Sequence, residues 1–478
     1  MNFSLLFVHS TWVSVALAVA LPSGIAIFFP NAASAATPPK PQNSSSAVQV
    51  PDYLNPNPNP LQFPTKPEEV RIQRNVPISL AQALELAKRN NRDLQVAILE
   101  LERSRSSLRE SQAALFPTLA INSSLINSGN GFTSNSSQAS TSFNGSAQLN
   151  YGLYTSGNRQ AAIRAAEEQL RVDELNVEST SLEVDLNVTT EYYDLQQADE
   201  EVRINRSAVE NAQASLRDTQ AREQAGVGTR FDVLQAQVNL ANAQQLLTNA
   251  ISNQQIARRR LATRLSLAQS VNITAADPVQ LAGLWQPTLE ETILRAFQNR
   301  PELQQQLAQR NIDEQRRRQA LSQLGPQISL AANYNLLDRY DDGVSITDGY
   351  SVGLEGNVTL FDGGAARASA AQSRANIAIA ESQFGSQRDL IRFDVEQYYS
   401  QLQSNLNNVQ SSTVALNQAR EALNLARLRF QAGVGTQTEV ISAENDLTRA
   451  EGNRIAAILD YNRALANLQR SVTSRASR

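Results

Sequence analysis

The sequence contains no cysteine and a single histidine among its 478 residues. The absence of cysteine excludes disulfides, thiolate nucleophiles and cysteine-based metal sites. His9 lies in an N-terminal segment that we expect to be removed, so the mature chain has no histidine for a catalytic triad or a histidine-rich zinc site. We therefore expect neither an enzyme nor a bound metal or other cofactor.

Lysine is also scarce, and positive charge is not in excess. The only lysines are Lys40, Lys66 and Lys88, and the formal net charge is −4. We expect no nucleic-acid partner, because such binding needs a basic surface that displaces counterions. Hydrophobic residues make up 41% of the chain, which is near the globular norm and argues against disorder throughout.

Long hydrophobic runs are absent after the N-terminus. Residues 3–29 are largely apolar, and Ala33-Ser34-Ala35 is typical of a cleavage site, so we predict a signal peptide over 1–35. No basic residue precedes the apolar stretch, and a membrane-anchoring helix is the alternative reading. Beyond this segment no run of about 18 apolar residues occurs, so no further transmembrane helix is predicted.

A segment rich in proline, asparagine and serine follows over 36–76, with alternating Asn and Pro between Asn55 and Pro60. Proline removes backbone donors and blocks helix formation. We therefore predict an extended linker here that contributes little to function.

The remainder of the chain is an internal duplication. Residues 79–125 can be laid over 288–334 with an offset of 209, and further on Ala225–Thr229 matches Ala432–Thr436 with an offset of 207. The period is far longer than that of solenoid repeats, so this is a tandem pair of large units. We place the first unit at 77–286 and the second at 287–472, followed by a C-terminal tail at 473–478.

Each unit has the same predicted order: a helical stretch, two strands, a very long helical stretch, a glycine turn and a last helix. The first helical stretches are predicted over 79–115 and 288–324, the very long ones over 158–222 and 365–430, and the last helices over 230–268 and 437–472. The strands are predicted at about 117–126 and 139–154, and at about 326–337 and 346–361.

The predicted strands alternate apolar with polar residues, as when Leu149 and Tyr151 alternate with Gln148 and Asn150. This alternation fits a half-buried sheet of a soluble domain, but it is also the signature of barrel strands that span lipid. The polar faces are mostly Ser, Asn and Gln, as a wet lumen requires. Four strands cannot close a barrel, because the smallest membrane barrels have about eight. Three chains would supply twelve.

The long helices are also unusual, because 158–222 contains neither Pro nor Gly. At 1.5 Å per residue such a helix is roughly 98 Å long, far beyond the globular average. A dimeric coiled coil is one interpretation. The apolar positions are irregular and rich in alanine, which favours a curved wall of many helices.

Two glycine turns join the long helices to the last helices, and their local role is the first interpretation. Gly226 and Gly433 would each end a helix in the left-handed conformation. Thr436 and Glu439 have the spacing of a capping box, and Thr229 with Asp232 is a weaker version of it.

The two turns, their doubling and the Leu360–Gly364 step into the second long helix together resemble the TolC family of outer-membrane efflux proteins. The resemblance covers roughly 77–472. It implies a mostly α-helical chain with a membrane β portion, in which a homotrimer forms one shared 12-stranded β-barrel and one long α-helical barrel. It places the chain in the outer membrane of a Gram-negative-type cell, in contact with outer-membrane lipid, with a periplasmic helical extension.

The resemblance also implies roles for residues at the turns. The tips would dock on a periplasmic adaptor protein through Arg222, Gly226, Thr229, Arg429, Gly433 and Thr436. Glu439 matches an acidic position that lines a pore constriction, and Asp232 matches one that helps hold the mouth shut. Ser442 stands where some members have a second acid, which puts a doubled acidic ring in doubt. Capping and gating roles are compatible in one carboxylate.

The function implied is that of a passive exit duct in a tripartite efflux or type I secretion system. An adaptor and an inner-membrane transporter of the ABC or RND type would supply the substrate. The alternative is a periplasmic or surface coiled-coil protein, structural or adaptor-like, without a pore. The sequence does not identify the cargo.

Overall fold

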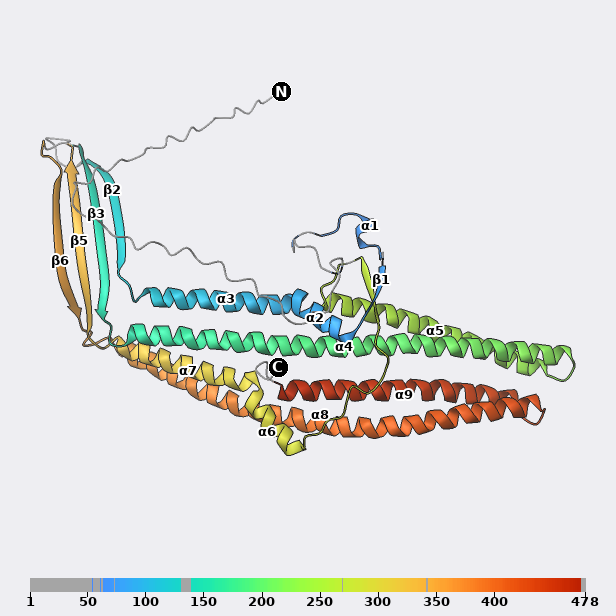
Figure 1. Cartoon of the computed structure of the whole chain (residues 1–478). Helices are drawn as coiled ribbons and strands as arrows, with labels where there is room; N and C mark the ends of the chain where they lie inside the picture. The colour runs from blue at the N-terminus through green and yellow to red at the C-terminus, as the bar shows by residue number, and fades with distance from the viewer. Residues whose placement is uncertain are drawn as a thin grey trace, which may run out of the picture. The chain divides into compact units, whose positions relative to one another are not determined.

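Four long helices and a four-stranded sheet dominate the computed structural model (Figure 1). The structure describes residues 54, 61, 63–72, 74–129, 139–268, 270–340 and 343–473, all within one compact unit that spans Val48–Arg478. The predicted signal peptide, most of the predicted linker and residues 474–478 of the tail lie outside the described residues.

The same order of elements occurs twice. The first half contains α2 (Leu80–Asn90), α3 (Arg92–Ala113), β2 (Thr118–Gly129), β3 (Ala139–Tyr154), α4 (Asn158–Gln224) and α5 (Arg230–Arg264). The second half contains α6 (Leu289–Asn299), α7 (Pro301–Ser322), β5 (Gln327–Arg339), β6 (Thr347–Asn357), α8 (Ala365–Gln431) and α9 (Gln437–Val472). Three short elements lie outside this pattern: α1 (Pro67–Val70), β1 (Arg74–Ile78) and β4 (Val271–Ala275).

The helical stretches predicted over 79–115 and 288–324 each consist of two helices with one break between them. At the second break, Pro301 begins α7 and Arg300 before it has extended dihedrals, as the residue before a proline prefers. At the first break Asn91 is extended, and its side chain accepts a hydrogen bond from the Leu94 N–H, which caps α3. Both breaks therefore have a local chemical cause.

The two very long helices are confirmed: α4 and α8 each have 67 residues. At 1.5 Å per residue each is about 100 Å long. On the sheet side of the chain the helices lie in the order α3, α4, α7, α8, and beyond the middle in the order α5, α4, α9, α8 (Figure 1). They form a wall one helix thick, with α3 and α5 at one edge and α8 at the other.

The sheet is antiparallel, in the order β2-β3-β5-β6, and its two faces differ sharply in polarity. Residues opposite one another in the register share a face. The apolar face carries Leu119, Ile121, Leu125, Phe143, Ala147, Leu149, Tyr151, Ile328, Leu330, Ala332, Tyr334, Tyr350, Val352 and Leu354. The other face is mostly Ser, Asn, Gln, Thr and Gly. β2 and β6 are exposed throughout, so nothing in the described part of the chain covers them.

Two strand ends differ from the prediction. β2 continues to Gly129, past the expected end at about 126, because Ala139 in β3 is there to pair with it. β6 ends at Asn357 rather than at about 361, because β5 begins at Gln327, the partner of Asn357. Among the described residues, no strand lies beside the last four residues of the expected strand.

The parallel pair of β1 and β4 was not predicted from the sequence. Residues 67–70 and 74–76 fall in the predicted linker, but they form α1 and the start of β1. Leu54, from the proline-rich segment, is 2% exposed within the same hydrophobic cluster as β1 and β4. Leu54 is therefore packed in this cluster, and residues 67–70 are helical rather than extended.

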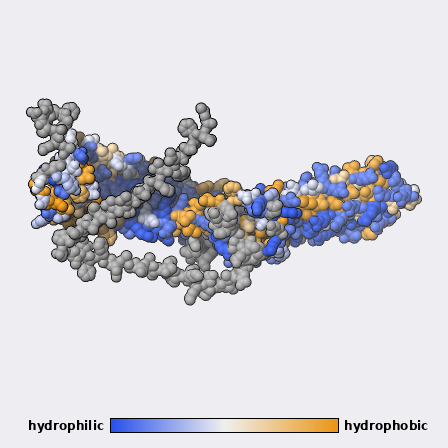
Figure 2. Space-filling model, turned by 90° about the horizontal axis from the view of Figure 1, so that it is seen from above, coloured by the Kyte–Doolittle hydropathy of each residue, from blue (hydrophilic) through white to orange (hydrophobic). Residues whose placement is uncertain are grey.

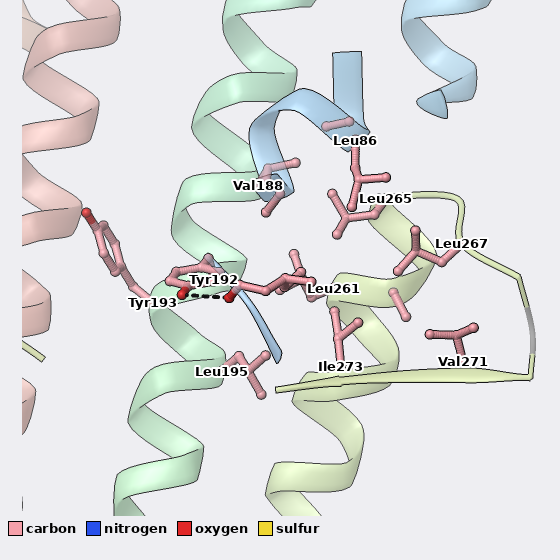
Figure 3. Close-up of a cluster of buried hydrophobic side chains, with 14 of the residues drawn as sticks. Leu86, Val188, Tyr192, Tyr193, Leu195, Leu261, Leu265, Leu267, Val271 and Ile273 are labelled. Atoms are coloured by element: carbon pink, nitrogen blue, oxygen red, sulfur yellow. Dashed lines mark hydrogen bonds between the residues drawn. The ribbon is translucent and has the colours of Figure 1, made fainter. Parts of the chain in front are cut away.

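That cluster lies where β1 and β4 cross α4 and α5, and Tyr192 is at its centre (Figure 3). Its hydroxyl lies 3.0 Å from the Ile78 carbonyl and 2.8 Å from the carboxylate of Asp277. The same carboxylate accepts a hydrogen bond of 2.7 Å from the Leu80 N–H at the start of α2. One buried tyrosine and one aspartate thus tie β1 and α2 to the middle of α4.

Ion pairs also join α7, α8 and α9 near the start of α7. Glu302 of α7 lies 2.6 Å from Arg470 of α9 and 3.2 Å from Arg300, which also lies 3.3 Å from Asp394 of α8. Burial alone would raise the pKa of Glu302, but the two guanidinium groups outweigh it and lower that pKa to about 2. Arg258 pairs with Asp199 at 3.1 Å and is largely buried.

Replacing Glu302 by glutamine should destabilise the helical part by about 3 kcal/mol at pH 7, because it leaves two largely buried arginines without their shared charge. Because the folded-state pKa is lowered, the wild-type contribution is complete above the unfolded pKa of about 4.3 and is lost as the pH falls towards 2. Urea unfolding followed by circular dichroism should show the difference at pH 7 and its disappearance near pH 2. The exposed Glu110→Gln serves as control, and equal stability of Glu302→Gln and wild type at pH 7 would refute the role.

Candidate functional site

The two turns that join α4 to α5 and α8 to α9 have the same backbone geometry, which we call the first tip (Ala225–Thr229) and the second tip (Ala432–Thr436). Gly226 has φ +75° and Gly433 has φ +77°. In the first tip the N–H groups of Val227 and Gly228 both donate to the Arg222 carbonyl at 3.0 Å, and the second tip repeats this on Arg429. The left-handed glycine expected at each helix end is confirmed.

A second glycine in each tip is required for space. A Cβ atom added at Gly228 would lie 2.9 Å from the Arg222 Cβ, and one at Gly435 would lie 3.0 Å from the Arg429 Cβ. The role of these two glycines was not predicted, although the Gly-x-Gly spacing in both copies indicates it. Each tip therefore uses one glycine for its dihedral and one for close approach.

The helix caps are the reverse of those predicted. Thr229 and Asp232 form a complete capping box at the start of α5, with each side chain bonded to the other residue's backbone. Thr436 accepts from the Glu439 N–H at 3.3 Å, but no reciprocal bond from the Glu439 side chain to the Thr436 backbone completes the box. The Glu439 carboxylate instead lies 3.8 Å from the Arg429 guanidinium. Asp232 is thus engaged in a cap, whereas Glu439 is exposed beside an arginine.

The structure brings the two tips together through Arg222. Its guanidinium carbon lies 4.3 Å from the centre of the Phe430 ring, in cation–π geometry, and its Nη2 lies 3.4 Å from the Gln431 carbonyl. At the start of α9, the buried Gln437 side chain donates a hydrogen bond of 2.6 Å to the Ser215 hydroxyl of α4. These contacts therefore hold the hairpin of α4 and α5 against the hairpin of α8 and α9 near the two tips.

Two other positions of α9, 442 and 444, decide whether a second exposed acid lies near Glu439. Ser442 is exposed and lies one turn beyond Glu439 on the same face of α9. Glu444 is the next acid, but it is buried and pairs with Arg427 at 3.0 Å, and burial raises its pKa. Glu444 therefore does not replace the second exposed acid that the sequence lacks at 442.

Both tips also expose apolar side chains. Val227 is 74% exposed and Val434 is 70% exposed, and Phe231 at the start of α5 is exposed as well. Each valine lies between the two glycines of its tip. This pattern suits a surface that is covered by another molecule.

Among the described residues no helix is both long and apolar enough to cross a membrane. Within the same residues no group of three or more metal-ligating side chains occurs.

Comparisons with known proteins agree with this geometry. The model of the outer membrane efflux protein family matches residues 83–266 and 292–473. The pyoverdine export outer membrane protein OpmQ of Pseudomonas aeruginosa is 25% identical over 411 residues, which is 81% of this chain and 82% of OpmQ. The fold is similar to that of VceC from Vibrio cholerae (TM-score 0.70, 18% identity, 82% of this chain and 95% of VceC). It is also similar to that of the open state of MtrE from Neisseria gonorrhoeae (TM-score 0.69, 18% identity, 89% of this chain and 98% of MtrE).

The chain combines an amphipathic sheet with a wall of helices about 100 Å long, and the helices end in two glycine tips. This combination defines the class of outer-membrane exit ducts. The chain belongs to the outer membrane efflux protein family. The predicted family is thereby confirmed, as are the outer-membrane location, the periplasmic helical part and the role as an efflux channel. Members of this family form trimers and work with adaptor proteins and inner-membrane transporters.

Proposed function

We propose that three copies of this chain form one exit duct, with a shared barrel of twelve strands in the outer membrane and a periplasmic tunnel of helices. The observation that carries the proposal is the sheet of four strands with an exposed apolar face and two unpaired edges, β2 and β6. In hydrocarbon an unpaired edge leaves backbone groups without partners, so such a sheet must close with other copies. In this arrangement the units 77–286 and 287–472 alternate around the axis.

The two edges of the helical wall support the same arrangement. Exposed apolar side chains line the α3 and α5 edge and also the α8 edge, and orange patches interrupt the blue surface along the helices in Figure 2. On the first edge these are Val96, Ile98, Leu99, Leu234, Val238, Leu246 and Ile256, and on α8 they are Ile379, Leu390, Phe393, Leu406, Val414, Leu425 and Leu428. Two apolar edges on opposite sides of one chain suit a closed ring of identical copies.

The tips are the proposed docking site for a periplasmic adaptor, which in turn connects to an inner-membrane transporter of the ABC or RND type. The six predicted docking residues all lie in or next to the two tips, where Val227 and Val434 are exposed. The duct itself performs no covalent chemistry and conducts passively. Both drug efflux and type I secretion fit this arrangement, so it is compatible with either kind of cargo.

Glu439 is the proposed gate residue. Three copies of an exposed carboxylate near the tunnel mouth would create a ring of negative charge, which attracts cations. Asp232 is less suited to the role of gate residue, because its carboxylate is engaged in the cap of α5. Ser442 would keep the next position of the ring neutral. Opening would require α8 and α9 to move away from α4, which breaks the contact between Arg222 and Phe430.

Single-channel recording in planar bilayers tests both the pore and the gate. The wild type should conduct with a preference for cations, and Glu439→Gln should reduce that preference severalfold, because a ring of three charges is removed. Ser442→Glu adds an acid on the same face and should shift the reversal potential the opposite way. Absence of wild-type channels would refute the duct, and unchanged selectivity in both variants would remove Glu439 from the gate.

A further inference from the structure

Two glycines lie inside the four longest helices, and both belong to the second half of the chain. Gly385 lies in α8 and Gly452 lies in α9, whereas α4 and α5 contain no glycine. With the offset of 207, the first half has Gln245 at the position of Gly452. Glycine weakens a helix, because it loses more conformational freedom on folding than any other residue, so its presence here needs a physical reason.

Neither backbone conformation nor lack of space requires these two glycines. Neither has a positive φ, and a Cβ atom added at either would meet nothing within 4 Å. They differ in this from Gly228 and Gly435 of the tips, where a Cβ atom would lie 3.0 Å or less from an arginine side chain. The remaining effect of a glycine in the middle of a helix is to make that helix easier to bend.

The helix α9 is closely packed on either side of Gly452, but a cavity lies beside Gly452 itself. Towards the sheet Leu459 and Tyr461 are at most 1% exposed, and towards the tip Val440 is buried in one cluster with Leu423 of α8. Between these two parts an open cavity of about 580 Å³ lies between α8 and α9. Its apolar lining consists of alanine alone: Ala415 and Ala419 from α8, and Ala450, Ala456 and Ala457 from α9. Side chains of this size leave the two helices room to shift against each other.

The helix α8 is also weakened beside the same cavity. Ser412, which lines the cavity, donates to the Val409 carbonyl at 3.1 Å, and Thr413 donates to the same carbonyl at 2.7 Å. Hydroxyl groups that bond back to the preceding turn compete with the hydrogen bonds of the helix and often bend it. The first half has Asn205 and Arg206 at these positions, and neither carries a hydroxyl. The hairpin of α8 and α9 therefore has a weak point in both helices that the matching positions of α4 and α5 lack.

The two parts of α9 on either side of Gly452 are held to α4 by contacts of different strength. Towards the sheet, Arg463 forms an ion pair with Asp194 of α4 at 2.8 Å. Towards the tip, the neutral Gln437 side chain bonds to the neutral Ser215 hydroxyl. Hydrogen bonds between ionised groups are roughly twice as strong as those between neutral groups. The part of α9 beyond Gly452 can therefore leave α4 while the part nearer the sheet stays in place.

We propose that Gly452 is the hinge of the gate, about which residues 437–451 of α9 and the adjoining part of α8 bend away from α4 when the duct opens. The inference rests on the proposed function, in which Glu439 lies at the mouth, and it identifies where the helices bend. A kink of about 20° at Gly452 would move the start of α9 by roughly 8 Å, because about 22 Å of helix lies between them. That movement is enough to break the 4.3 Å contact between Arg222 and Phe430.

Gly452→Ala tests the hinge, and Gly385→Ala is the matched control. Both variants replace a helical glycine with open space around it, but Gly385 lies nearer the sheet, away from the cavity. Arg222→Ala removes the contact with Phe430 and should open the duct without an adaptor. In the Arg222→Ala background, Gly452→Ala should lower the open probability about fivefold, because alanine favours the straight helix of the closed state. Gly385→Ala should leave the open probability unchanged.

Single-channel recording in planar bilayers gives the open probability, and thermal melting followed by circular dichroism should show a similar rise in stability for both alanine variants. A fall in open probability with Gly452→Ala alone supports the hinge. Equal open probability in the two alanine variants overturns the hinge and leaves the proposed function standing. If the wild type forms no channels, or if Arg222→Ala does not open them, the proposed duct or its gate is overturned, and the hinge with it.

Discussion

Mild oxidation of a variant with cysteines at positions 122 and 357 should convert most of the chain into a covalent trimer. Asn150 lies opposite Ala331 where β3 pairs with β5, and the two offsets turn that pair into Asn357 of one copy and Asn122 of the next. Opposite residues in an antiparallel pair are about 4.5–5.5 Å apart, within reach of a disulfide. Because each copy supplies one cysteine to each neighbour, a closed ring of three is linked all the way round.

The chain suits this experiment because it has no native cysteine. Both asparagines lie on the polar face, so their replacement removes no apolar contact with lipid. The control moves one cysteine to Glu355, two residues out of register, where the distance of roughly 7–8 Å exceeds the reach of a disulfide. Non-reducing gels should show trimers for 122 with 357 and few for 122 with 355. Equal linkage in both pairs would contradict the register, and a purely monomeric product would contradict the ring.

Much of this fold could be predicted because its elements are long and their patterns repeat. The helices α4 and α8 contain no proline, and each contains at most one glycine, so only their ends needed to be found, and glycine turns mark those ends. The sheet followed from strict alternation, which locates strands without knowledge of their partners. Because the chain is duplicated, each element could be predicted in two copies, and a weak pattern in one copy was supported by the other.

The parts that could not be predicted depend on contacts between distant residues. β1 and β4 have five residues each and pair across nearly two hundred residues of chain, so neither carries a signal by itself. The end of β6 depends on whether a neighbouring strand is present. Arg258 lies in a run of three arginines whose exposure could not be told apart until α5 was placed against Asp199 of α4.

The candidate site shows the same division. Gly226, Gly433 and the N-cap threonines Thr229 and Thr436 are local features, and they were predicted correctly. The exchange of roles between Asp232 and Glu439 is not local, because Glu439 turns towards Arg429 across the second tip. The contact between Arg222 and Phe430 joins residues more than two hundred positions apart and was visible only in the folded chain.

Replacing Val227 and Val434 together by aspartate should nearly abolish export while leaving the channel intact. Each valine is exposed between the two glycines of its tip, and docking on an adaptor would transfer both to an apolar surface. Loss of a central apolar contact typically costs about 2 kcal/mol, roughly 30-fold in affinity, and a buried unpaired carboxylate costs more. In a trimer the change is repeated at six tips.

The measurements are the survival of cells that depend on this duct to remove a toxic compound, and the recovery of adaptor with the purified duct. Ile346→Asp is the matched control, because Ile346 is an equally exposed apolar residue in the loop before β6, far along the chain from either tip. Single-channel conductance and trimer mass should be unchanged in all variants, because neither valine packs within the chain. Normal export with aspartate at both tips would show that the adaptor binds elsewhere on the helical wall, and a rise in conductance would show that the valines hold the mouth closed instead.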